Sequence, residues 1–174
     1  MGIQFETDYN METLTAMAKG LRKTARKKRS RRVHIFAAVV LILGLLTILA
    51  TTAGGEPLGA SGVVTLLAML VVILVSLFED KLNAWFARKR LLPGTEHAAA
   101  TFEEDGYVSA TGVTESRFSY AQIVAVAETA RYFVFALSSH HTQAYDKRTI
   151  RGGSVEDFRA FIAEKTGKPV EKIK

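Results

Sequence analysis

Two long apolar runs dominate this chain: VHIFAAVVLILGLLTILATTA (residues 33–53) and, after GGEP (54–57), LGASGVVTLLAMLVVILVSLF (58–78). Each run has 21 residues and contains no Asp, Glu, Lys or Arg. A helix rises about 1.5 Å per residue and the hydrocarbon core of a bilayer is roughly 30 Å thick, so each run is long enough to cross once. We predict a transmembrane hairpin with spans at 33–53 and 58–78, because a cleaved signal would begin earlier and lack a second run.

The net charge of +6 lies in the segment before the first span. Residues 1–32 carry nine basic and three acidic residues, whereas residues 98–174 carry ten of each. Basic flanks stay in the cytoplasm, and the second span is also followed by basic residues. The proposed topology signal consists of Arg26, Lys27, Lys28, Arg29, Arg31 and Arg32. We therefore expect both termini in the cytoplasm and the loop at 54–57, with Glu56 as its one charge, on the opposite side of the membrane.

The segments beside the spans predict short helices. In residues 1–32, an alternating strand around Phe5 precedes a basic juxtamembrane helix capped by Asp8 or Asn10. This helix is expected to run on into the first span. Residues 79–94 predict a juxtamembrane helix and a linker, with Trp85 and Phe86 as interfacial anchors.

In residues 95–174 apolar residues recur at every second position, with turn residues at short intervals. This pattern predicts a cytoplasmic β domain. Its expected strands are 98–104, 107–111, 114–120, 123–129, 132–138 and 142–149. A closing helix begins at the cap Ser154 and ends at Gly167. This layout is that of a pleckstrin-homology-like (PH-like) barrel. The predicted class is an α+β membrane protein with an N-terminal strand and helix, a two-helix transmembrane hairpin and a six- to seven-stranded PH-like β barrel capped by one α-helix.

The chain also resembles the YcxB-like family of bacterial membrane proteins. The matching segments are FEEDGY (102–107), SYAQI (119–123), YFVFAL (132–137) and AYDKR (144–148). Two departures are Tyr120, where the family often has Trp, and Asp146, which replaces the usual Pro and makes the following bend less rigid. The resemblance implies a fold and a membrane location, and it brings no established activity with it.

The sequence offers few residues that could catalyse a reaction or bind a metal. The chain has no cysteine, and the pair His140 and His141 lacks further ligands at metal-binding spacing. The acidic run 103–105 has the character of a solvated turn rather than a calcium loop. No nucleophile elbow or phosphate loop is present. We therefore expect no catalytic residue, metal, cofactor or small-molecule substrate, and a protein that is not an enzyme.

The remaining candidates are contacts with lipid or protein. Lys147, Arg148 and Arg151 form a local basic cluster of the β domain, and their alternative role is pairing with nearby acids. Nucleic acid is not expected, because the β domain is neutral and has no basic face with interleaved aromatics. The leading hypothesis is a non-enzymatic protein of the bacterial inner membrane that presents a cytoplasmic PH-like domain as an accessory or assembly subunit, or scaffold. Its expected partners are membrane lipids and membrane proteins. The alternative is a tethered module that senses lipid headgroups through the basic cluster.

Overall fold

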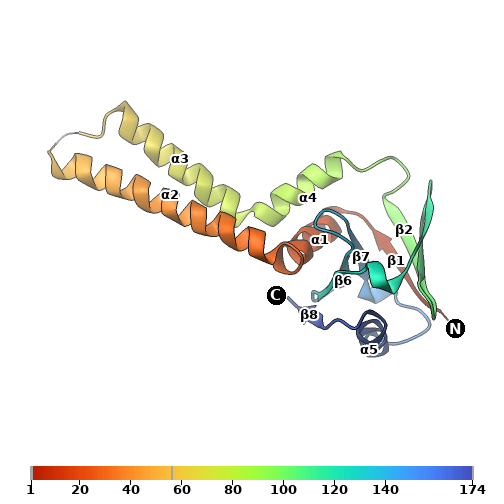
Figure 1. Ribbon diagram of the computed structural model, residues 1–174. Helices are drawn as coiled ribbons and strands as arrows, with labels where there is room; N and C mark the ends of the chain where they lie inside the picture. The colour runs from red at the N-terminus through yellow and green to blue at the C-terminus, as the bar shows by residue number, and fades with distance from the viewer. Residues whose placement is uncertain (1, 56, 174) are drawn as a thin grey trace.

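A hairpin of two long helices projects from one end of a mixed α+β domain in the computed structural model, which describes residues 2–55 and 57–173 (Figure 1). The helices α2 (Lys27–Ala53) and α3 (Ala60–Leu77) are the two arms of the hairpin. Their most apolar windows have mean hydropathies of 2.7 and 2.6, and none of the residues in those windows is buried. Both helices are therefore long and apolar enough to span a membrane. The expected lone loop charge, Glu56, lies outside the described residues.

The domain contains two four-stranded sheets. The first is antiparallel and runs in the order β1 (Ile3–Asp8), β2 (His97–Phe102), β3 (Tyr107–Thr111) and β4 (Glu115–Phe118). The second has the order β7 (Thr142–Asp146), β6 (Tyr132–Ala136), β5 (Ala125–Glu128) and β8 (Val170–Lys172), with β8 parallel to β5. All six strands expected between residues 98 and 149 are present, and β1 and β8 complete the sheets.

The expected closed barrel is not formed by the described residues, which build two separate sheets. Where β1 approaches the end of β7, hydrogen bonds of the Thr149 side chain replace most of the backbone hydrogen bonds that would join two paired strands. The Thr149 hydroxyl accepts from the Glu6 amide at 3.0 Å and donates to the Glu6 carbonyl at 2.7 Å, in the 3-10 helix η2 (Lys147–Thr149). Beyond it, the described residues form a single isolated bridge, from Gln4 to Arg151. At the other side a second 3-10 helix, η1 (Tyr120–Gln122), separates β4 from β5.

An aromatic core fills the space between the sheets. Phe158 of α5 (Val155–Thr166) contacts Phe5 and Phe102 of the first sheet, with ring centroids 4.7 and 4.8 Å apart, and Phe133 of the second at 5.0 Å. The helix begins as predicted, since Ser154 forms a capping box with Asp157, and it ends at Gly167 with φ of 63°.

The N-terminal segment belongs to the same structural unit as the C-terminal domain. Phe5 pairs in register with Ala100 and is 1% exposed. The helix α1 (Met11–Lys23), capped by Asn10, packs on the second sheet and brings Gly20 against Val134. This arrangement differs from the expected division into residues 1–32 and 95–174.

The expectation that the basic helix runs unbroken into the first span is wrong. The chain turns at Thr24 to Arg26, where Thr24 leaves helical geometry with φ of −112° and ψ of −95°. The cause is packing: α1 must follow the sheet, whereas α2 leaves the domain. After α3 the chain bends again into α4 (Glu79–Lys89), which returns toward α1 (Figure 1).

Candidate functional site

Each member of the predicted basic cluster faces an acid. The Lys147 ammonium lies 2.9 Å from Glu128 Oε1 and donates to the Thr129 carbonyl at 2.8 Å. The Arg148 guanidinium binds both carboxylate oxygens of Asp146, at 3.1 and 2.9 Å. Arg151 lies 3.4 Å from Glu6. The structure thus brings these three cations to one region but compensates each charge, and Lys147 is largely buried.

Glu128 is the centre of a half-buried ion network. Its side chain is 5% exposed, and Arg159 binds both of its oxygens at 2.7 and 2.8 Å. The hydrogen bonds from the Arg159 guanidinium are the main cause that lowers the pKa of the Glu128 carboxyl, to about 2. Burial acts in the opposite direction, and Lys147 lowers the pKa further. This arrangement keeps Glu128 ionised, and its single negative charge is shared by Lys147 and Arg159, while Arg159 also lies 3.5 Å from Glu156.

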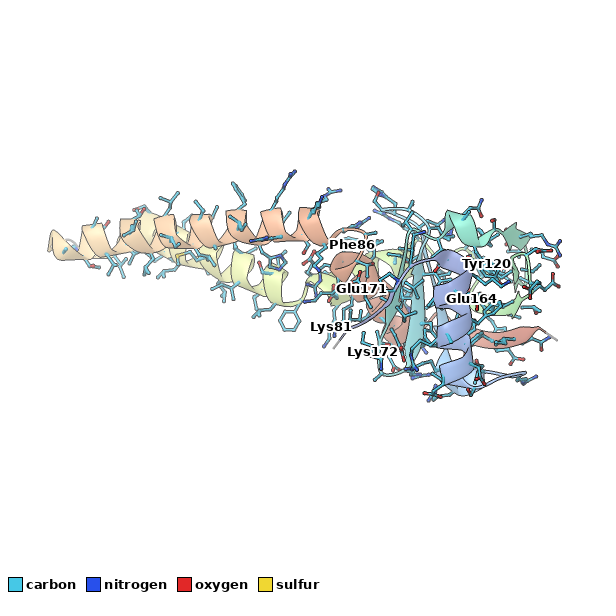
Figure 2. All side chains as sticks on the ribbon, turned by 60° about the horizontal axis from the view of Figure 1, so that its bottom comes forward. Lys81, Phe86, Tyr120, Glu164, Glu171 and Lys172 are labelled. Atoms are coloured by element: carbon cyan, nitrogen blue, oxygen red, sulfur yellow. The ribbon has the colours of Figure 1, made fainter. Side chains whose placement is uncertain are left out.

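A cavity of about 930 Å³ lies beside this network, between α1, the turn from β5 to β6, and β8. We call it the C-terminal groove. Its lining includes the apolar residues Met11, Ala16, Ala130, Tyr132 and Ile173 and the basic residues Lys19, Lys81, Arg131, Lys147 and Lys172. Figure 2 shows Lys81 of α4 and Lys172 of β8 at the end of the domain nearest the hairpin.

The sequence analysis predicted a contact role for Lys147 of the groove, but not for Lys19, Lys81 or Lys172. Lys19, Lys81 and Lys172 form no ion pair within residues 2–55 and 57–173. Arg131, in contrast, is paired with Asp146 at 2.9 Å and also with Glu12. The three lysines come from α1, α4 and β8, which only the fold brings together, so no local motif contains them.

The domain is clamped to the base of the hairpin through α1 and α4. Arg22 of α1 donates two hydrogen bonds to Asp80 of α4, at 2.7 and 2.6 Å, and lies 3.7 Å from Glu79. The hydrogen bond to Asp80 raises the pKa of Arg22. Ala84 on the same face of α4 is fully buried. The bidentate geometry fixes direction as well as distance.

The predicted anchors and topology signal lie at this junction. Trp85 and Phe86 on α4 are about half exposed and contact each other at a centroid distance of 4.9 Å. The Lys89 ammonium lies 3.6 Å from the Trp85 ring centroid. The residues Arg26, Lys27, Lys28, Arg29, Arg31 and Arg32 occupy the cap and first turns of α2.

The residues weighed for chemistry have ordinary surface contacts. The ring of His140 lies 3.1 Å from the Ser139 hydroxyl, Glu103 lies 3.4 Å from Arg117, and Glu104 pairs with Lys165. Within the described part of the chain, no group of three or more potential metal ligands occurs. The absence of enzymatic activity stays a prediction.

One segment of the chain is similar to a known protein family. The family model described as YcxB-like protein matches residues 102–162, from the end of β2 to the last turns of α5. No curated protein and no solved structure matches the chain. The matched segment contains the four motifs on which the resemblance rests, and the chain therefore carries a YcxB-like domain, as those motifs predicted.

Proposed function

We propose that this chain is a non-enzymatic membrane protein that acts as an accessory or assembly subunit, holding its YcxB-like domain at the cytoplasmic face of a bacterial inner membrane for a protein partner. The Leu, Ile and Val side chains of α2 and α3 are largely exposed, and contact of such a large apolar surface with water would be unfavourable. This surface supports the membrane location, because the hydrocarbon core would cover it. The basic start of α2 supports the orientation.

The positions of the chain ends are consistent with this topology. The strands β1 and β8 both belong to the domain at one end of the hairpin (Figure 1). A hairpin that crosses twice leaves both ends in one compartment. The two sheets, with Phe158 of α5 packed between them, also support a PH-like arrangement of the domain.

The observation that carries the proposal is the clamp between Arg22 and Asp80. The side chains are only 21% and 16% exposed, so the ion pair is partly shielded from solvent. Together with the buried Ala84, it holds the domain at a fixed angle to the apolar helices. A flexible tether would suffice to keep a domain near the membrane, whereas a docking platform benefits from a fixed orientation.

The C-terminal groove is the proposed contact for the partner. Its apolar wall and its three lysines without an ion pair in the described chain complement a segment that combines apolar and acidic side chains. Charge complementarity steers association, while the apolar contact supplies most of the affinity. The rival basic surface, around Arg148 and Arg151, offers cations that acids already compensate.

The experiment is native co-purification of the full chain in mild detergent, with quantitative mass spectrometry of bound proteins. The groove variant Lys19→Glu/Lys172→Glu is compared with Arg148→Glu/Arg151→Glu, which changes the net charge by the same amount on the other surface. We expect a stoichiometric partner to be lost from the groove variant and retained by the control. Equal retention by both variants, or loss from the control alone, would contradict the proposed contact.

Carbonate extraction and labelling of tags at the two ends test the location separately. We expect the protein to stay in the membrane fraction, with both tags protected on the cytoplasmic side. Release by carbonate, or tags on opposite sides, would overturn the membrane proposal itself.

A further inference from the structure

A second cavity, of about 560 Å³, lies where the hairpin meets the domain. We call it the arginine cleft. It is lined by α1, the start of α2, α4 and the loop between β6 and β7. The residues that matter here are Arg22, Arg26, Arg29 and Arg90, with Val33 and Phe86 as apolar neighbours.

Two of these arginines have side chains without a partner in the described chain. Arg22 is paired with Asp80 and lies near Glu79, and Arg26 donates to the Ser139 carbonyl. Arg29 of α2 and Arg90, the residue that caps α4, form no side-chain hydrogen bond or ion pair in the part that the structure describes. The one carboxylate lining the cleft, Glu79, is already shared by Arg22 and His34.

The cleft joins this positive charge to the apolar surface of the hairpin. Val33 is the first residue of the apolar run and is 54% exposed, and Phe86 on α4 is 51% exposed. A guanidinium pairs strongly with phosphate oxygens, and an exposed apolar wall favours hydrocarbon. Basic pockets between helices at the cytoplasmic side of a membrane are suited to lipid headgroups, and this volume is in the usual range for a ligand site.

We propose that the arginine cleft binds one anionic phospholipid of the cytoplasmic leaflet, with its phosphate between Arg29 and Arg90 and its acyl chains along the apolar wall. The lipid would connect α2 with α4 and so reinforce the clamp made by Arg22. An acidic protein segment could pair with the two arginines. It would not cover the apolar wall of Val33 and Phe86, which continues into the apolar run of α2. The inference rests on the membrane location proposed above.

The test is native mass spectrometry of the full chain in mild detergent, titrated with phosphatidylglycerol and, in parallel, with phosphatidylcholine. The variant Arg29→Gln/Arg90→Gln removes the two free cations. The control Lys28→Gln/Arg88→Gln removes the same charge from the same two helices at residues that do not line the cleft. We expect binding of phosphatidylglycerol to weaken about 25-fold in the first variant, since each basic residue near an anionic surface contributes roughly a factor of five. The control should stay close to the wild type.

A second variant separates a shaped site from general attraction. Arg29→Lys/Arg90→Lys keeps the charge and removes the forked geometry, so we expect severalfold weaker binding even if the Gln variant does not fold. Unchanged binding in the Lys variant, equal loss in cleft and control variants, or no preference over phosphatidylcholine would each overturn the inference. So would equal binding of glycerol phosphate, which has no acyl chain, or displacement of the lipid by an acidic peptide. Retention of the protein in carbonate-washed membranes with any of these results would leave the proposed location intact.

Discussion

Replacing Arg159 by Gln tests the buried ion network around Glu128. The pKa of Glu128 falls from its ordinary 4.5 to about 2, with the Arg159 guanidinium as the main cause. One pKa unit corresponds to about 1.4 kcal/mol, so the folded site favours the ionised form of Glu128 over the protonated form by about 3 kcal/mol more than the unfolded chain does. Lys147 supplies part of this, and Arg159 is 26% exposed, so we expect Arg159→Gln to lower the free energy of unfolding by about 2 kcal/mol at pH 7.

The sign of the pH dependence follows from a depressed pKa. The contribution of Glu128 is fully present above pH 4.5 and is lost as the pH falls toward about 2, because the carboxyl then becomes protonated in the folded state too. The stability difference between wild type and Arg159→Gln should therefore close over this window.

The assay is chemical denaturation of the full chain in mild detergent, followed by near-ultraviolet circular dichroism of the buried tyrosines. A double-mutant cycle with Glu128→Gln should give a coupling energy of about 2 kcal/mol. The control Arg117→Gln removes a 3.4 Å pair with Glu103 whose side chains are more than half exposed, and it should cost less than about 0.5 kcal/mol. If Arg159→Gln costs the same with and without the Glu128 carboxylate, the reasoning is wrong.

Three further predictions use the same denaturation assay. Gly20→Ala should destabilise by about 1–3 kcal/mol, because its Cβ would lie 2.7 Å from a methyl of Val134. The control Gly59→Ala has no described atom within 4 Å of its Cβ and changes only the N-cap of α3, so it should cost less than about 1 kcal/mol; equal effects would contradict the packing of α1. Phe5→Ala should lower the free energy of unfolding by about 3–5 kcal/mol, because Phe5 is buried in the core. A negligible change would show that β1 does not contribute to the stability of the core. Tyr107→Phe deletes a 2.7 Å hydrogen bond to buried Gln143 and should cost about 1 kcal/mol; an unchanged midpoint would show that the bond does not contribute.

Much of the local structure follows from short sequence patterns. The turn at residues 103–106 connects β2 and β3 as predicted, with the Glu103 amide donating to the Gly106 carbonyl at 2.8 Å. The cap Ser154 starts α5 for the same local reason. β8 was missed because a strand of three residues after Pro169 has no alternating pattern of its own, and it pairs with β5 only through the fold.

The candidate sites depended more on the fold than on local sequence. From the sequence, Lys147 was either a contact residue or the partner of a nearby acid such as Asp146, whereas the structure pairs it with Glu128, 19 residues away. The C-terminal groove combines Lys19, Lys81 and Lys172 from three elements. No motif could indicate either result, because ion pairing depends on which faces of the sheets and helices meet.

Local patterns in the chain are enough to predict the two apolar helices, the six central strands and the capped final helix, since hydropathy, alternation and capping act over a few neighbouring residues. Three features could be seen only in the folded protein: Phe5 and α1 complete the C-terminal domain, the sheets stay separate, and Arg22 joins this domain to α4. These features arise from contacts between distant segments, whose energy depends on burial and on the geometry of both partners.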